Sequence, residues 1–177
     1  INIALNKLGE FAKTERNYLF LFSEDKNSAV INNIWFADHS AGQQVYLEKW
    51  SIEQLPWFIK QLNQFKTISI PSVTQLPESA NKEKQLLQSQ QTLSTILIPL
   101  CYEKELVGFI GFDSLLKEKE WSQEDEVLLR LAGEICVNAL MKGKIKQELK
   151  EHQSELEKLG EKRTKKITNA IDLLQWK

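Results

Sequence analysis

The last third of the sequence constrains the fold most strongly, because it predicts a helix with no residue that would end it. No proline follows Ser122, and Ser122 with Asp125 three residues later is typical of a helix N-cap. Beyond Met141 the apolar residues recur at alternating spacings of four and three, the heptad rhythm of a coiled coil. This seam consists of Ile145, Leu149, His152, Leu156 and Leu159.

The part of this helix before the seam carries another apolar stripe. It comprises Leu128, Leu131, Ile135 and Ala139, and its spacing predicts a helix face that is turned toward the core of a domain. The later seam is too narrow to be buried by one helix alone, so it needs a partner helix. We therefore expect a parallel homodimer formed through the C-terminal helix.

Charge divides the chain near Met141. Residues 1–141 contain 13 Lys or Arg and 18 Asp or Glu, a net charge of −5, whereas residues 142–177 contain 10 and 6, a net charge of +4. This shift predicts a globular domain over residues 1–141 and a coiled-coil linker helix over residues 142–177. The overall net charge of −1 argues against a nucleic-acid partner.

The apolar runs are all short. The runs at 18–22 and 95–100 are far below the length that spans a bilayer, and no basic start precedes a long apolar stretch. We expect a cytoplasmic location and no direct membrane contact in this segment. Because the chain begins with Ile1 rather than Met, we also expect it to be a piece of a longer protein.

The pattern of the first 141 residues alternates between helices and strands. Runs rich in β-branched and aromatic residues predict strands, and two pairs of these strands are hairpins because only a few polar residues join their members. The prediction is an α+β fold with an antiparallel sheet of five or six strands flanked by helices. Expected helices are 1–13, 56–65, 78–91 and the one from Ser122, and expected strands are 18–22, 29–36, 43–47 (weak), 67–70, 94–102 and 105–113.

Four segments resemble one known family. The segments "TERNYLFLFSED", "IWFA", "LPWFIKQL" and "TILIPLCYEKELVGFIGFDSLLKEKEWSQEDEVLLRLAGEICVNAL" are similar to the strands, the Pro-Trp helix start and the closing hairpin and helix of GAF domains. The resemblance covers about residues 1–141 and implies a sensory or regulatory domain of bacterial signalling proteins. The tail resembles the coiled linkers that join such sensors to output domains, such as kinases, cyclic-dinucleotide enzymes or transcription regulators.

Residue types that carry catalysis are sparse. The two histidines, His39 and His152, and the two cysteines, Cys101 and Cys136, have no spacing typical of a metal site or a nucleophile with its base. The resemblance implies that a bilin would need a cysteine beside a histidine, and no such pair occurs. We expect no catalysis, no cofactor, no covalent chromophore and no bound metal, with both cysteines reduced.

Aromatic residues are the candidates for a small-molecule site. A pocket between the sheet and the helices that cover one of its faces would use Trp35, Phe36, Trp50, Trp57 and Phe58. The alternative is that these side chains fill the core.

Three functions follow from these observations. The first is a sensor that binds an unidentified small molecule and relays the change through a dimeric helix to an output domain of the same chain. The second is a dimerisation and relay module without a ligand, and a closed pocket of at least about 300 Å³ would separate it from the first. The third is a reductase of methionine sulfoxide, which would need a set of pocket cysteines that Cys101 and Cys136 do not match.

Overall fold

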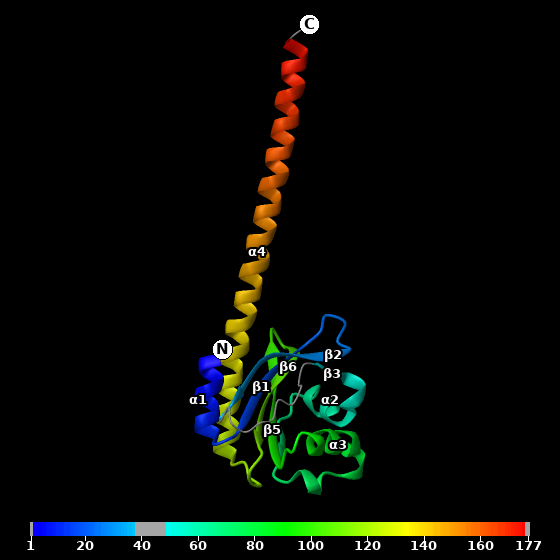
Figure 1. The fold of residues 1–177 in the computed structure, drawn as a ribbon, viewed down its shortest axis with the longest axis vertical. Coiled ribbons are helices and arrows are strands. Elements are labelled where there is room, and N and C mark those ends of the chain that lie inside the picture. Colours follow the sequence, from blue (N-terminus) through cyan, green and yellow to red (C-terminus); the bar gives the residue numbers. More distant parts are fainter. Residues whose placement is uncertain (1, 38–48, 176–177) are drawn as a thin grey trace. The chain divides into compact units, whose positions relative to one another are not determined.

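The computed structural model describes residues 2–37 and 49–175. For residue 168 and residues 170–175 it describes the backbone alone. His39 and the predicted weak strand at 43–47 lie outside the described residues. The described residues form four helices, six strands and three short 3-10 turns, and Figure 1 shows how they are arranged. They are α1 (Asn2–Ala12), β1 (Arg16–Phe22), β2 (Ser28–Phe36), β3 (Lys49–Ser51), η1 (Ile52–Gln54), α2 (Pro56–Leu62), β4 (Ile68–Ile70), η2 (Val73–Gln75), η3 (Glu78–Ala80), α3 (Asn81–Ser89), β5 (Ser94–Tyr102), β6 (Glu105–Ser114) and α4 (Gln123–Gln175).

The sheet is antiparallel and has the strand order β3-β2-β1-β6-β5-β4. The hairpins β1–β2 and β5–β6 are joined through the central pair β1–β6, in which Arg16 lies opposite Asp113. The predicted α+β fold is confirmed, and so are both hairpins. Strand β3, which pairs with the start of β2, was not predicted because its three residues are too few to show an alternating pattern.

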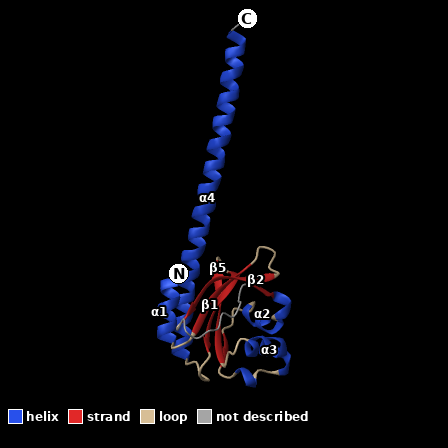
Figure 2. Ribbon diagram, viewed as in Figure 1, coloured by secondary structure: helices blue, strands red, loops and turns tan. Residues whose placement is uncertain are grey.

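One face of the sheet is covered by α2 and α3, as Figure 2 shows. Side chains alternate between the two faces along a strand, so Tyr18 and Phe20 of β1 point to the same side. There they pack with Phe109 of β6, Trp50 of β3 and Phe58 of α2 in the main hydrophobic core.

The opposite face packs against α1 and the first part of α4. A Cβ added to Gly9 of α1 would lie 2.2 Å from the ring of Trp35, so only glycine lets the helix come this close. On α4, a Cβ added to Gly133 would lie 3.0 Å from Leu100 of β5 and 3.4 Å from Ile110 of β6. This closeness fixes which side of α4 is turned toward the sheet.

The side of α4 that faces the core differs from the prediction. The buried residues are Leu129, Gly133, Cys136 and Val137, whereas Leu128, Leu131 and Ile135 are 47%, 52% and 70% exposed, and Ala139 is exposed. The predicted core stripe is therefore wrong. The helix has two apolar stripes in this region, and the prediction selected the one with the larger side chains.

The start of α4 is capped as predicted. The hydroxyl of Ser122 accepts a hydrogen bond from the backbone N–H of Asp125 (3.0 Å), and the Asp125 carboxylate accepts one from the backbone N–H of Ser122 (3.0 Å). This reciprocal pair satisfies two donors that a helix end would leave free. Neither Gly143 nor Gly160 interrupts the helix that follows.

The chain forms two compact units, residues 1–138 and 139–177. The described part of the second unit is helical, and the apolar seam residues Ile145, Leu149, Leu156 and Leu159 are all exposed on it. His152 is exposed as well. None of the helices in the described ranges combines the length and the apolar character that crossing a membrane requires.

Candidate functional site

Three of the five predicted ligand-binding aromatics lie on the α2 side of the sheet. Trp50 is only 4% exposed and stacks on Phe20, with ring centroids 4.6 Å apart, while Phe20 also stacks on Phe109 at 5.2 Å. Phe58 is buried, and half-buried Trp57 lies against it with ring centroids 5.9 Å apart. The space beneath α2 is thus occupied by packed rings.

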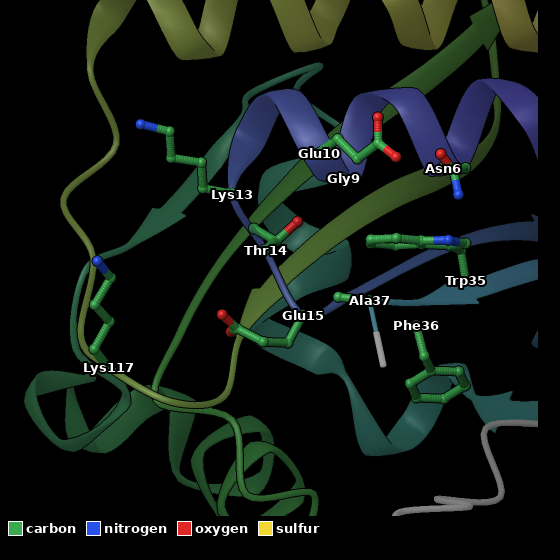
Figure 3. A pocket seen from close by; sticks show the side chains of 10 residues that line it. All are labelled: Asn6, Gly9, Glu10, Lys13, Thr14, Glu15, Trp35, Phe36, Ala37 and Lys117. Carbon is green, nitrogen blue, oxygen red and sulfur yellow. The ribbon is translucent and has the colours of Figure 1, made fainter. Parts of the chain in front are cut away.

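Trp35 and Phe36, the other two predicted residues, lie at a different place, near the end of β2. They line a cavity of about 470 Å³ that is open to solvent rather than closed, shown in Figure 3. The structure therefore does not bring the five aromatics together at one site. The cavity is lined by Asn6, Gly9, Glu10, Lys13, Thr14, Glu15, Trp35, Phe36, Ala37 and Lys117.

The connection between α1 and β1 lines the cavity with its three residues, 13–15. Lys13 adopts a φ of 49°, in the left-handed region, and the backbone N–H of Thr14 donates to the carbonyl of Gly9 (3.1 Å). This bond closes the helix end. The hydroxyl of Thr14 then donates to Asn17 Oδ1 (2.6 Å), and Asn17 Nδ2 donates to the carbonyl of Leu5 (3.1 Å). These bonds fix α1 against β1 beside the cavity.

The charged side chains of the cavity differ in their partners. Glu15 accepts a hydrogen bond from the backbone N–H of Leu115 (2.7 Å), and Glu10 forms an ion pair with Lys7 (2.9 Å). Within the described ranges, the ammonium groups of Lys13 and Lys117 have neither a hydrogen bond nor an ion pair. Glu10 is thus paired with a lysine, Glu15 keeps its negative charge, and the ammonium groups of Lys13 and Lys117 are available.

Lys119 adds a third positive charge next to these two. Its ammonium group donates to the carbonyl of Ala12, at the end of α1, and lies 4.4 Å from the ring centroid of Trp121. Burial lowers the pKa of Lys119, and the positive charges of Lys13 and Lys117 lower this pKa further, although the negative charges of Asp125 and Glu15 oppose them. The ammonium group of Lys119 is therefore close enough to those of Lys13 and Lys117 to be repelled by both.

A buried ion pair between β1 and β6 lies close to the α1–β1 connection in sequence, but it belongs to the core. Arg16 donates to Asp113 and to the hydroxyl of Thr92 (2.7 Å), and both charged side chains have no exposed area. The hydroxyls of Tyr18 (3.2 Å) and Thr95 (2.5 Å) donate to the other carboxylate oxygen of Asp113. Because Arg16 and Asp113 are well supplied with partners, this cluster holds strands together and offers no free group to a ligand.

Glu83 of α3 is a buried carboxylate that sequence reasoning missed. Its Oε1 accepts hydrogen bonds from the backbone N–H groups of Trp57 (2.7 Å) and Phe58 (3.3 Å), at the start of α2. The N-cap residue of α2, Leu55, has no side chain that could do this. Oε2 is buried and without a partner in the described structure. A lone glutamate in a polar helix gave no sequence signal for this contact.

The described ranges contain no cluster of residues suited to metal binding. There, no group of three or more His, Cys, Asp or Glu residues is close enough together to hold a metal ion. Cys101 and Cys136 are free thiols, as predicted, and burial raises the pKa of each. A raised pKa leaves little nucleophilic thiolate at neutral pH.

A family model defines the class of this protein. The family model described as "GAF domain" matches residues 1–140, and the chain belongs to the GAF domain family. One similar protein is the methanogenesis regulatory histidine kinase FilI of Methanothrix harundinacea, 26% identical over 167 residues. The match covers 89% of this chain but only 18% of the kinase, so the chain spans less than a fifth of its relative. The chain is thus a GAF domain over residues 1–140, and it is similar to a segment of a regulatory histidine kinase.

Solved structures support the same fold. A domain of a sensor histidine kinase protein of a two-component system from Sinorhizobium meliloti has a TM-score of 0.65 and 13% identity, covering 84% of this chain and 93% of its own. GAF3 of Slr1393 from Synechocystis has a TM-score of 0.68 and 9% identity, covering 83% and 94%. At these identities the likeness shows the fold alone. It confirms the predicted GAF-like sheet with flanking helices.

Proposed function

We propose that this chain is the input and relay segment of a larger signalling protein. In this proposal the domain binds a small molecule, α4 pairs with α4 of a second copy, and the pair carries the change to an output domain. The chain itself performs no catalysis. The observation that carries the proposal is the exposed apolar seam along α4.

The exposed stripe inside the domain continues the seam of the second unit in heptad register. Counting in sevens from Leu128 reaches Ile135, Lys142, Leu149 and Leu156, and counting from Leu131 reaches Asn138, Ile145, His152 and Leu159. Apolar residues thus occupy seven of these ten positions. All seven side chains are exposed. Burying each would stabilise a complex by roughly 1.5–3 kcal/mol before the entropic cost of association is subtracted. Repeats of this kind are what paired helices bury.

A second copy in parallel orientation suits this register. Parallel pairing places each seam residue opposite its own counterpart, so Leu128, Leu131 and Ile135 contact the same residues of the partner. Antiparallel pairing would set the domain of one copy against the tail of the other. Parallel pairing also brings both domains to one end of the coil and both outputs to the other end, as a relay requires.

Insertions into α4 of the full-length protein test the relay. Two residues inserted before Gly143 rotate everything beyond by about 200°, whereas four residues rotate it by about 40° and seven by about −20°. We expect the output to change strongly with two residues and to stay near normal with four or seven. If all three inserts behave alike, α4 is a passive tether and the relay is wrong.

The ligand-free module is the second candidate, and one observation favours it. The face beneath α2 is filled by the stacked rings of Phe20, Trp50 and Phe109, and the cavity at Trp35 is open rather than closed. A direct binding measurement at that cavity separates the two candidates. Binding of a small molecule there favours the sensor, and absence of binding favours the ligand-free module.

A further inference from the structure

We propose that the cavity lined by Trp35, Lys13 and Lys117 binds a small, flat organic anion. The indole ring of Trp35 would contact the flat part of the ligand, and the two ammonium groups would pair with its carboxylate or phosphate. The proposal rests on the proposed function, because it names the class of the small molecule that the domain senses. The binding assay itself does not depend on the relay.

The shape of the cavity supports a flat ligand. Figure 3 shows the Trp35 ring at one side of the cavity and the two lysines at the other, with Thr14 and Glu15 between them. Because α1 lies directly on Trp35 at Gly9, this ring has little freedom to turn. A rigid aromatic wall provides contact area at low entropic cost and favours a planar partner.

The charges of the cavity favour an anion over a cation. Glu10 is paired with Lys7, so Glu15 is the one lining acid without a cationic partner, whereas Lys13 and Lys117 are both unpaired in the described structure. The unpaired positive charges of the lining therefore outnumber the negative one. Both lysines also repel the nearby Lys119. An anionic group between Lys13 and Lys117 would relieve this repulsion and form charge-assisted hydrogen bonds.

The position of the cavity connects it with α4. Lys13 follows α1, and Lys117 lies in the short connection between the end of β6 and the start of α4. Lys119 in the same connection is already bound to the last residue of α1, Ala12. A ligand that spans Lys13 and Lys117 would therefore tighten the link between α1 and the segment that leads into α4. If the domain has two conformations that differ at this link, the ligand would bind one of them more tightly and would shift the equilibrium toward it.

Calorimetric titration of the 177-residue chain tests the proposal with four probes. Indole-3-acetate and phenyl phosphate are flat anions with different acid groups, indole-3-acetamide is flat and uncharged, and inorganic phosphate is an anion without a ring. We expect one or both flat anions to bind roughly ten-fold more tightly than the other two probes, because indole-3-acetamide lacks the charged contact and inorganic phosphate lacks the contact with the Trp35 ring.

A double variant shows whether the binding occurs in this cavity. Lys13→Asn keeps a residue that tolerates the left-handed backbone, and Lys117→Gln removes the second charge at an exposed position. Together they should weaken flat-anion binding roughly ten-fold or more. The matched control is Lys60→Gln on α2, an exposed lysine outside the cavity lining, which should leave binding unchanged.

Three outcomes would overturn the proposal. They are binding of indole-3-acetamide as tight as that of indole-3-acetate, unchanged binding in the double variant, and no binding of either flat anion at millimolar concentrations. Sedimentation of the same samples reports dimerisation independently. A dimer that binds no anion would refute the ligand class alone, whereas an anion-binding monomer would refute the paired relay alone.

Discussion

Arg16 on β1 donates two hydrogen bonds to one carboxylate oxygen of Asp113 on β6, from Nε at 2.9 Å and from Nη2 at 2.5 Å, and neither side chain has any exposed area. The two strands are hydrogen-bonded neighbours at the centre of the sheet. A buried ion pair contributes to stability only while both partners remain, because either charge alone is costly to bury.

Asp113→Asn should therefore destabilise the domain by about 3–5 kcal/mol, since it leaves the Arg16 guanidinium buried without a counter-charge. Urea unfolding measures this loss. The control Glu120→Gln removes one negative charge at an exposed position and should change stability by less than about 0.5 kcal/mol. A loss below about 1 kcal/mol for Asp113→Asn would show that the pair is not buried as described.

Because of Tyr18, we expect the domain to become less stable at alkaline pH. Burial, followed by the charge of Asp113, raises the pKa of the Tyr18 phenol well above its ordinary value of 10.0. The folded state thus keeps a proton that the unfolded state releases, so the stability is complete below pH 10.0 and declines as the pH rises above it. Tyr18→Phe should flatten this decline, whereas Tyr102→Phe, at a half-buried position, should not. Equal slopes in both variants would contradict the assignment.

Glu83 of α3 should stabilise the start of the neighbouring helix α2. Glu83→Ala removes the acceptor of two backbone N–H groups and should cost about 1–2 kcal/mol, whereas Glu83→Gln retains an acceptor and should cost less. Chemical denaturation measures both values. If the two variants lose equal stability, the carboxylate charge rather than the acceptor holds the helix.

The substitution Leu131→Asp tests whether Leu131 faces solvent, as observed, or the core of the domain, as predicted from the sequence. Leu131 is 52% exposed on the domain, so an aspartate there should leave the melting of the isolated domain nearly unchanged and should weaken the dimer. A charge at Leu129, which is fully buried, should unfold the domain instead. Unfolding of the domain by Leu131→Asp would restore the original prediction of a core stripe.

Much of the fold could be predicted from local patterns. Strand β5 has the predicted bounds, 94–102, because apolar residues run continuously between polar turns, and the Ser122–Asp125 cap needs only residues three apart. The error on α4 had a physical cause. Leu128 and Ile135 have the size and spacing of core residues, and only the close approach at Gly133 shows which side of the helix meets the sheet.

The candidate site could be predicted only in part. Trp35 and Phe36 were named as ligand candidates, but nothing local places Lys117 of the β6–α4 connection beside Lys13 at the end of α1. That proximity results from the pairing of β1 with β6, which joins segments far apart in sequence. Glu83 was missed for the same reason, since its contacts with α2 span about 25 residues.

The central claim is that α4 pairs two copies of this chain through its apolar seam. Analytical ultracentrifugation of the 177-residue chain at tens of micromolar, compared with Leu149→Asp and Ser154→Asp, tests it most directly. Leu149 occupies the seam, whereas Ser154 lies on the opposite heptad position, so both variants add the same charge on different sides of the helix. The account predicts a dimer for the unmodified chain and for Ser154→Asp, and a monomer or a much weaker dimer for Leu149→Asp. A monomeric unmodified chain, or equal affinities in all three proteins, would contradict it.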